Sequence, residues 1–203
     1  MPTSLFDYSN FQEDISKHEM KIIKDDGVYR HIQVKEPGTS FYWFEVITSP
    51  RLLTINGDMG TYSFSRIEDM FQFFNKALGK INEPYWTQKL VSFSSPVRKY
   101  SPEVFKQVVT EEFNEAFDER ADVCAVPSEE ESLRTEGLSR LDSEVLVFAD
   151  TPETAARYLD KFSYKGVHFY DTWEWDFDEY DYKYLWNLHA IVWTVNAYNE
   201  AIA

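Results

Sequence analysis

The sequence has little of what marks several common protein classes. Only one of its 203 residues is a cysteine, Cys124, which excludes a disulfide framework and a cysteine-based zinc finger. No apolar run approaches the ~20 residues of a membrane span. Met1 is followed by Pro2 and mixed polar residues, which does not fit a secretory signal peptide. The sequence therefore predicts a soluble, cytoplasmic protein.

Basic residues are scarce relative to acidic ones. Twenty Lys and Arg face 35 Asp and Glu, which gives a net charge of −15. Because phosphate contacts need cations, this balance argues against direct binding to DNA, RNA or an anionic membrane. Aromatic residues make up 17% of the chain and hydrophobic residues 43%, so a packed core is expected rather than disorder.

The negative charge is unevenly distributed. Residues 1–100 contain twelve acids and twelve bases, whereas residues 101–203 contain 23 acids and eight bases. We expect a single α+β domain over residues 1–203, subdivided into a neutral, β-rich part (1–100) and an acidic, helical part (101–203). Such an asymmetry favours a functional acidic face.

The first half predicts an antiparallel sheet with a packed helix. Asp26-Gly27 between two apolar runs is a strong hairpin signal, and a second hairpin turns at Gly57 to Gly60. A helix is predicted from a cap at Ser65 to a stop at Gly79. The predicted strands lie within residues 20–34, 40–48 and 52–64.

The second half predicts mainly helices. Ser101-Pro102-Glu103 combines a hydroxyl cap, an early proline and an acid that the helix dipole favours, so a helix is expected to about residue 121. The remaining expected elements are helices over 152–162 and 179–200 and strands over 145–149 and 167–170. Residues 128–141 form either a short helix or an acidic loop, and residues 171–178 alternate rings and carboxylates between two faces if the segment is extended.

Two rows of carboxylates are the main candidates for a binding surface. The first, on the helix that begins at Ser101, consists of Glu111, Glu115, Asp118 and Asp122, flanked by Glu112 and Glu119. Like charges four residues apart destabilise a helix by ~0.2–0.5 kcal/mol per pair, so stability alone does not explain this row. The second consists of Glu174, Asp176 and Asp178, which alternate with Trp173, Trp175 and Phe177 and would lie ~6.6 Å apart on an extended chain.

Three other chemistries are weaker alternatives. A divalent-metal enzyme acting on nucleic acid could use hard oxygen ligands from Asp171, Asp176, Asp178 and Asp181, with His168 nearby. Nucleophilic catalysis has no Gly-x-Ser-x-Gly motif to support it. Cys124 is a poor nucleophile candidate, because its acidic neighbours Asp118 and Asp122 would raise its thiol pKa. The twelve aromatic residues among residues 164–198 suggest a small-ligand site, although rings at helical spacing are more often core.

Two stretches, residues 41–71 and the aromatic stretch 182–198, resemble an uncharacterised group of small accessory proteins of tailed bacteriophages and prophages. The resemblance covers about a third of the chain and carries no catalytic motif. It implies a cytoplasmic setting in an infected bacterial host and a role against host machinery, as in anti-restriction or anti-CRISPR proteins.

We therefore predict a non-enzymatic phage inhibitor, with no cofactor, whose acidic rows mimic DNA. Its expected partner is a basic protein or ribonucleoprotein surface of a host defence complex. A structural subunit that binds another phage protein with weak salt dependence is a further alternative. The oligomeric state and the row that makes contact remain open.

Overall fold

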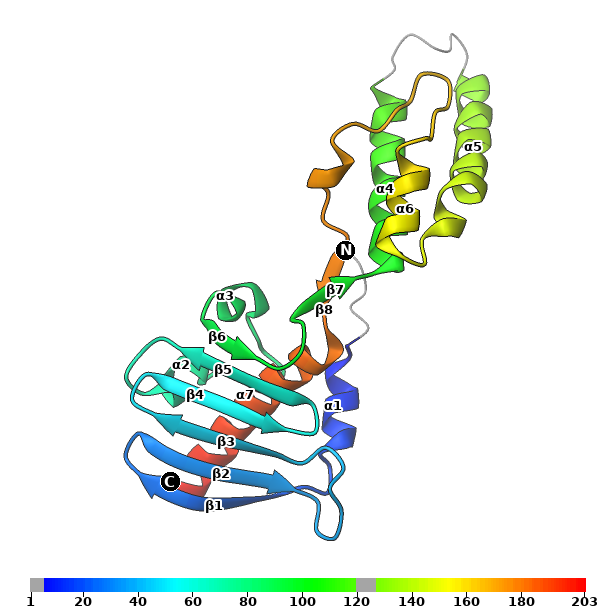
Figure 1. Ribbon diagram of the computed structural model, residues 1–203. Helices are drawn as coiled ribbons and strands as arrows, with labels where there is room; N and C mark the ends of the chain where they lie inside the picture. Colours follow the sequence, from blue (N-terminus) through cyan, green and yellow to red (C-terminus); the bar gives the residue numbers. More distant parts are fainter. Residues whose placement is uncertain (1–5, 120–126) are drawn as a thin grey trace. The chain divides into compact units, whose positions relative to one another are not determined.

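The computed structural model describes residues 6–119 and 127–203, which fold as an α+β protein with two compact units (Figure 1). The sheet unit contains residues 6–97 and 180–203, and the acidic unit is Arg98–Glu179. The division thus differs from the predicted one at residue 100, because the C-terminal helix belongs with the sheet. The acidic unit is an insertion in the chain of the sheet unit.

Six antiparallel strands form the sheet, each paired with its neighbours in sequence. They are β1 Glu19–Asp26, β2 Tyr29–Lys35, β3 Phe44–Ser49, β4 Leu52–Gly57, β5 Gly60–Ser65 and β6 Leu90–Phe93. Both predicted hairpins are confirmed: Asp26 pairs with Tyr29 and Gly57 with Gly60, each across two residues. Gly27 has a φ of 60°, a conformation that glycine adopts at no steric cost.

Four helices accompany the sheet: α1 Tyr8–Asp14, α2 Met70–Phe74, α3 Glu83–Thr87 and α7 Tyr182–Ile202. The predicted helix from Ser65 to Gly79 is wrong in length. Asp69 caps it instead, because its carboxylate accepts a hydrogen bond from the Phe71 amide at 3.0 Å.

The C-terminal helix α7 is confirmed and covers one face of the sheet (Figure 1). Apolar residues lie on most sides of α7 itself, so a stable fold must bury more than one side of this helix. Trp186 is fully buried, and its ring meets those of Phe11 and Phe44 edge-on at 5.2 and 5.5 Å. α7 is therefore a central part of the core of the sheet unit.

The acidic unit has its own hydrophobic core. Its helices are α4 Pro102–Asp118, α5 Pro127–Glu144 and α6 Pro152–Leu159, with 3₁₀ turns η1 Leu146–Phe148 and η2 Thr172–Glu174. The short strands β7 Arg98–Tyr100 and β8 Asp178–Tyr180 pair with each other. Phe105, Val109, Phe113 and Phe117 form the buried face of α4, as the sequence predicts.

Two predicted strands are wrong, and a third segment is not extended throughout. Residues 146–148 form the 3₁₀ turn η1: Val145 and Ala149 are buried but Val147 between them is 59% exposed, which does not fit the two-residue period of a strand. Residues 167–170 contain only an isolated bridge from Tyr164 to Val167. The segment 171–178 is not continuously extended, since Asp171 has a φ of 52° and η2 follows it.

Candidate protein-binding surface of the acidic unit

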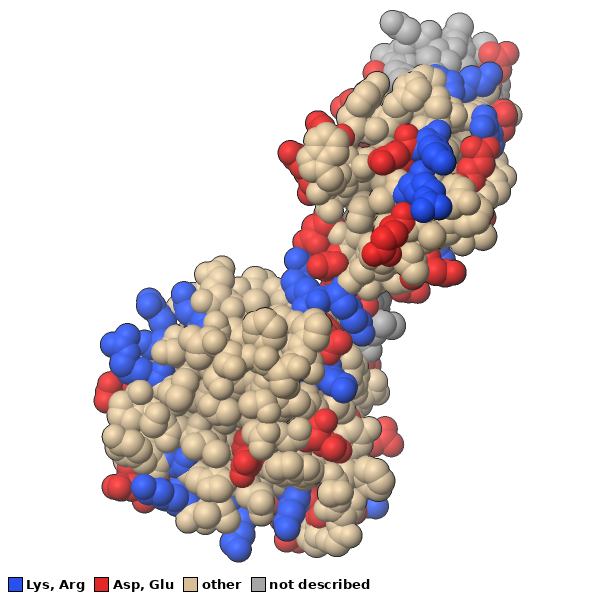
Figure 2. Space-filling view, viewed as in Figure 1, with Lys and Arg blue, Asp and Glu red and all other residues tan. Residues whose placement is uncertain are grey.

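Most of the charge of the chain lies in the acidic unit. Residues 98–179 contain 21 Asp and Glu against nine Lys and Arg, a net charge of −12 out of −15. In the view of Figure 2, acids and bases alternate on the visible face of this unit, whereas uncharged residues dominate the visible face of the sheet unit. The acidic unit thus carries most of the excess negative charge of the chain.

Helix α4 presents the first predicted row. The Ser101 hydroxyl caps the helix by accepting from the Val104 amide at 3.3 Å, and the phenylalanine face is buried. Glu111, Glu115 and Glu119 are exposed on successive turns. The structure therefore brings these three carboxylates to one solvent-facing side of the unit.

Asp118, another member of this row, is paired with a cation of α5. Asp118 forms an ion pair with Arg134 of α5, whose guanidinium also lies 3.6 Å from Glu130 and 4.7 Å from the centre of the Phe117 ring. Arg134 therefore reduces the charge that Asp118 presents to a partner.

Glu112 lies partly buried behind the exposed carboxylates. Desolvation raises the pKa of its carboxyl, and the nearby charges of Glu115 and Glu111 raise it further. The negative form of Glu112 is thus less favoured than that of a fully hydrated glutamate. Asp122 lies outside the described residues.

The second predicted row is not a straight line of equivalent carboxylates. Asp176 pairs with Arg98 at 2.8 Å and accepts from the Asp178 amide at 3.1 Å, and the hydrogen bond from Arg98 holds the pKa of Asp176 below its usual value. Arg98 also donates to the Asp178 carbonyl at 2.6 Å. The contacts of Arg98 with Asp176 and Asp178 therefore connect β7 to the start of β8. The side chains of Glu174 and Asp178 are exposed.

The metal-site alternative has no ligand set in the described part of the chain. No three His, Cys, Asp or Glu side chains converge there in a way that could hold an ion. Asp176, the centre of the proposed set, is instead engaged by Arg98. None of the described helices is long and apolar enough to cross a membrane.

A groove lies between α6 and the segment that follows Phe169, within the aromatic-rich region for which the sequence suggests a small-ligand site. It has a volume of about 390 Å³, and we call it the aromatic groove. Its lining consists of Ala156, Leu159, Asp160, Phe169, Tyr170, Asp171, Thr172, Trp173 and Phe177. The density of aromatic residues in the sequence signalled this region, but not which rings face solvent.

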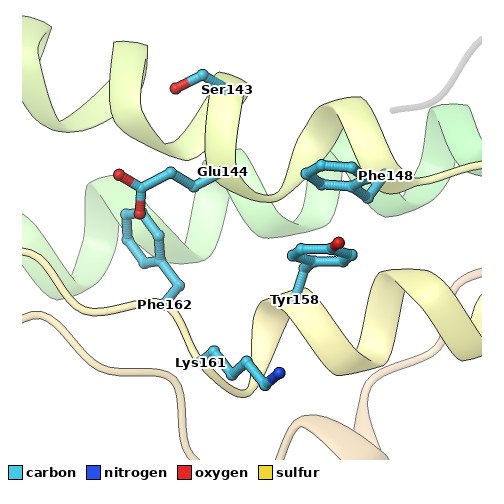
Figure 3. Close-up of a pocket in the computed structure, with 6 residues that line it drawn as sticks. All are labelled: Ser143, Glu144, Phe148, Tyr158, Lys161 and Phe162. Carbon is cyan, nitrogen blue, oxygen red and sulfur yellow. The ribbon is translucent and has the colours of Figure 1, made fainter.

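A second cavity, of about 330 Å³, lies between the end of α5 and α6 (Figure 3). The rings of Phe148 and Tyr158 stack at 3.8 Å on one side of it. Glu144 accepts from Arg140 at 2.7 Å, and Lys161 points away from Glu144. Glu144 and Lys161 therefore do not face each other across this cavity.

Comparison with known proteins gives no match: no protein family, curated protein or solved structure is significantly similar to this chain.

Proposed function

We propose that the protein is a non-enzymatic inhibitor whose acidic unit occupies a basic, nucleic-acid-binding surface of another protein. The observation that carries this proposal is the exposed carboxylate row Glu111, Glu115 and Glu119 on a unit with a net charge of −12. The resemblance to phage accessory proteins gives the expected setting, which is a host defence complex of the restriction or CRISPR type.

The spacing of the row is compatible with mimicry of a nucleic-acid strand. At ~1.5 Å per residue, α4 rises ~12 Å from Glu111 to Glu119. One strand of DNA places a phosphate every ~3.4 Å along the axis, or about four over the same distance. Together with the partly neutralised Asp118, α4 presents four carboxylates in that span. The helix thus offers a similar linear density of negative charge.

The helical core supports this function because it fixes, before binding, the backbone positions that carry the carboxylates. Phe113 and Phe117 hold α4 against α5, and the Arg134 ion pair connects the two helices near the end of the row. A rigid charged face loses little conformational freedom on association. Attraction to a basic surface would also accelerate encounter and would weaken as salt screens it.

The proposal is tested by capture from a bacterial lysate at about 50 mM and about 500 mM salt, where screening differs strongly. We expect the immobilised protein to retain nucleic-acid-binding proteins at low salt, and duplex DNA or high salt to release them. The triple variant Glu111→Gln/Glu115→Gln/Glu119→Gln should retain at least about tenfold less.

A matched control separates the α4 row from total charge. Glu13, Glu19 and Glu200 are exposed residues of the sheet unit, and their replacement by Gln changes the net charge by the same amount. This control should retain the captured proteins as the wild type does. Equal loss in both variants, or capture that DNA and salt do not reverse, would contradict the proposal and favour a structural subunit.

A further inference from the structure

Two large aromatic side chains of the aromatic groove face solvent. Trp173 is 79% exposed and Tyr170 is 75% exposed, and they lie three residues apart in the chain on one cavity. Single exposed apolar residues are ordinary, but a Trp and a Tyr on the same groove are typical of binding hot spots. These rings are therefore candidates for contact with a ligand rather than parts of the core.

The floor of the groove is fixed by the core of the acidic unit. Phe169 stacks on Phe162 at 5.7 Å, and Phe177 meets Phe105 of α4 edge-on at 4.9 Å. Thr172 donates a hydrogen bond to the Asp160 carboxylate at 3.0 Å, which connects η2 to the end of α6. The groove is thus preorganised on one side, with Tyr170 and Trp173 projecting from it.

The polar groups of the groove select for a cation. Asp160 and Asp171 both line it, and its described lining contains no Lys or Arg. Asp171 has a φ of 52°, a left-handed conformation that Asp and Asn tolerate better than most residues. An anion is disfavoured by these carboxylates and by the net charge of the unit.

We propose that the aromatic groove binds an arginine side chain of the basic partner, an inference that rests on the proposed function. A guanidinium is planar, less strongly hydrated than an ammonium, and able to stack on an aromatic face while donating to a carboxylate. Tyr170 and Trp173 supply the faces, and Asp171 and Asp160 supply the acceptors. The groove would anchor one residue, while the α4 row attracts the surrounding charge.

The test uses the full chain and a short glycine-rich peptide with one arginine, compared with the same peptide carrying citrulline. Citrulline keeps the shape of the side chain and removes its charge. Binding is followed by NMR at the indole N–H of Trp173, which is identified by its disappearance in Trp173→Phe. We expect the arginine peptide to shift this signal and the citrulline peptide to bind at least about fivefold more weakly.

Substitutions in the groove should reduce binding without unfolding the unit. Trp173→Ala should weaken arginine-peptide binding by about 5- to 30-fold, followed through the backbone amides of residues 169–174. Asp171→Asn removes the charge and keeps a residue that tolerates a positive φ. Phe41→Ala is the control, because Phe41 is 74% exposed but belongs to the sheet unit.

Each outcome supports or contradicts the proposal that the aromatic groove binds arginine. Equal binding of the citrulline peptide, or unchanged binding by Trp173→Ala, would overturn the inference. A shift of the Trp173 signal by a neutral oligosaccharide but not by the arginine peptide would identify a carbohydrate site instead and also overturn it. Because this assay contains no partner protein, it can fail while the lysate test of the α4 row succeeds, and the reverse also holds.

Discussion

The buried imidazole of His189 shows how a single residue makes the sheet unit sensitive to pH. His189 is 5% exposed on α7, and its ring stacks on Phe6 at 4.9 Å and lies near the rings of Tyr8 and Phe11. Burial lowers the pKa of His189 to about 4.

Acidification should destabilise the sheet unit through this residue. The unfolded state binds the proton near pH 6.5 and the folded state only near pH 4, so stability falls as pH decreases through that interval. His189→Phe keeps an aromatic ring and removes the titration. We expect thermal unfolding of this variant to depend less on pH between 6.5 and 4 than that of the wild type. An identical pH dependence in both would contradict the assignment.

Arg30 and Asp69 form a largely buried ion pair in the sheet unit. The two guanidinium nitrogens donate to the two carboxylate oxygens at 2.8 and 3.0 Å, and Arg30 also lies over the rings of Phe71 and Tyr198. The same carboxylate caps α2. One pair thus joins a sheet strand to α2 and α7.

Removal of one partner should be strongly destabilising because the other charge is left without compensation. We expect Arg30→Met to lower the free energy of unfolding by about 2–4 kcal/mol in urea titration. Arg66→Met serves as the control, since Arg66 is exposed. A change of less than about 0.5 kcal/mol in Arg30→Met would show that the pair contributes no net stability.

At the scale of elements, α5 contains a glycine that only tertiary packing explains. By intrinsic propensity alone, Gly137 would be a weak point inside a helix. In the structure Gly137 is buried, and an added Cβ would lie 2.8 Å from the Tyr164 ring and in closer conflict with Phe113. Its absent side chain lets α5 approach the core of the acidic unit.

Gly137→Ala should therefore destabilise the acidic unit although alanine is the better helix former. We expect a net loss of about 1–2 kcal/mol, because overpacking exceeds the ~1 kcal/mol gain in helix propensity. Ser139→Ala, at an exposed position of the same helix, should be neutral or stabilising. Both are measured by chemical unfolding monitored by circular dichroism, and stabilisation by Gly137→Ala would contradict the packing argument.

At the scale of the whole molecule, the chain leaves the sheet unit after Val97 and re-enters it at Tyr180. The Asp181 amide donates to the Val97 carbonyl at 2.9 Å, so the ends of the interrupted unit lie side by side. α7 then completes the core with Trp186 and its neighbours. The two parts of the sheet unit are thus in direct contact and share one core without residues 98–179.

Replacement of residues 98–179 by a short glycine-rich linker should leave the sheet unit folded. We expect a dispersed NMR spectrum and one cooperative thermal transition, because the hydrophobic core of that unit is retained. The same deletion combined with truncation at Asp181 should not fold, since α7 is lost. A shortened chain that retains α7 but does not fold would show that the acidic unit is needed for the sheet.

The sequence by itself determined the two hairpins, the cap of α4 and the C-terminal helix α7, because turn chemistry and periodicity are local signals. It also determined where negative charge is concentrated. Only the tertiary structure decided which carboxylates are paired with a cation or partly buried: Arg134 binds Asp118, Arg98 binds Asp176, and Glu112 is partly buried. These outcomes depend on residues far apart in the chain, as does the exposure of Trp173, and no local pattern encodes such contacts.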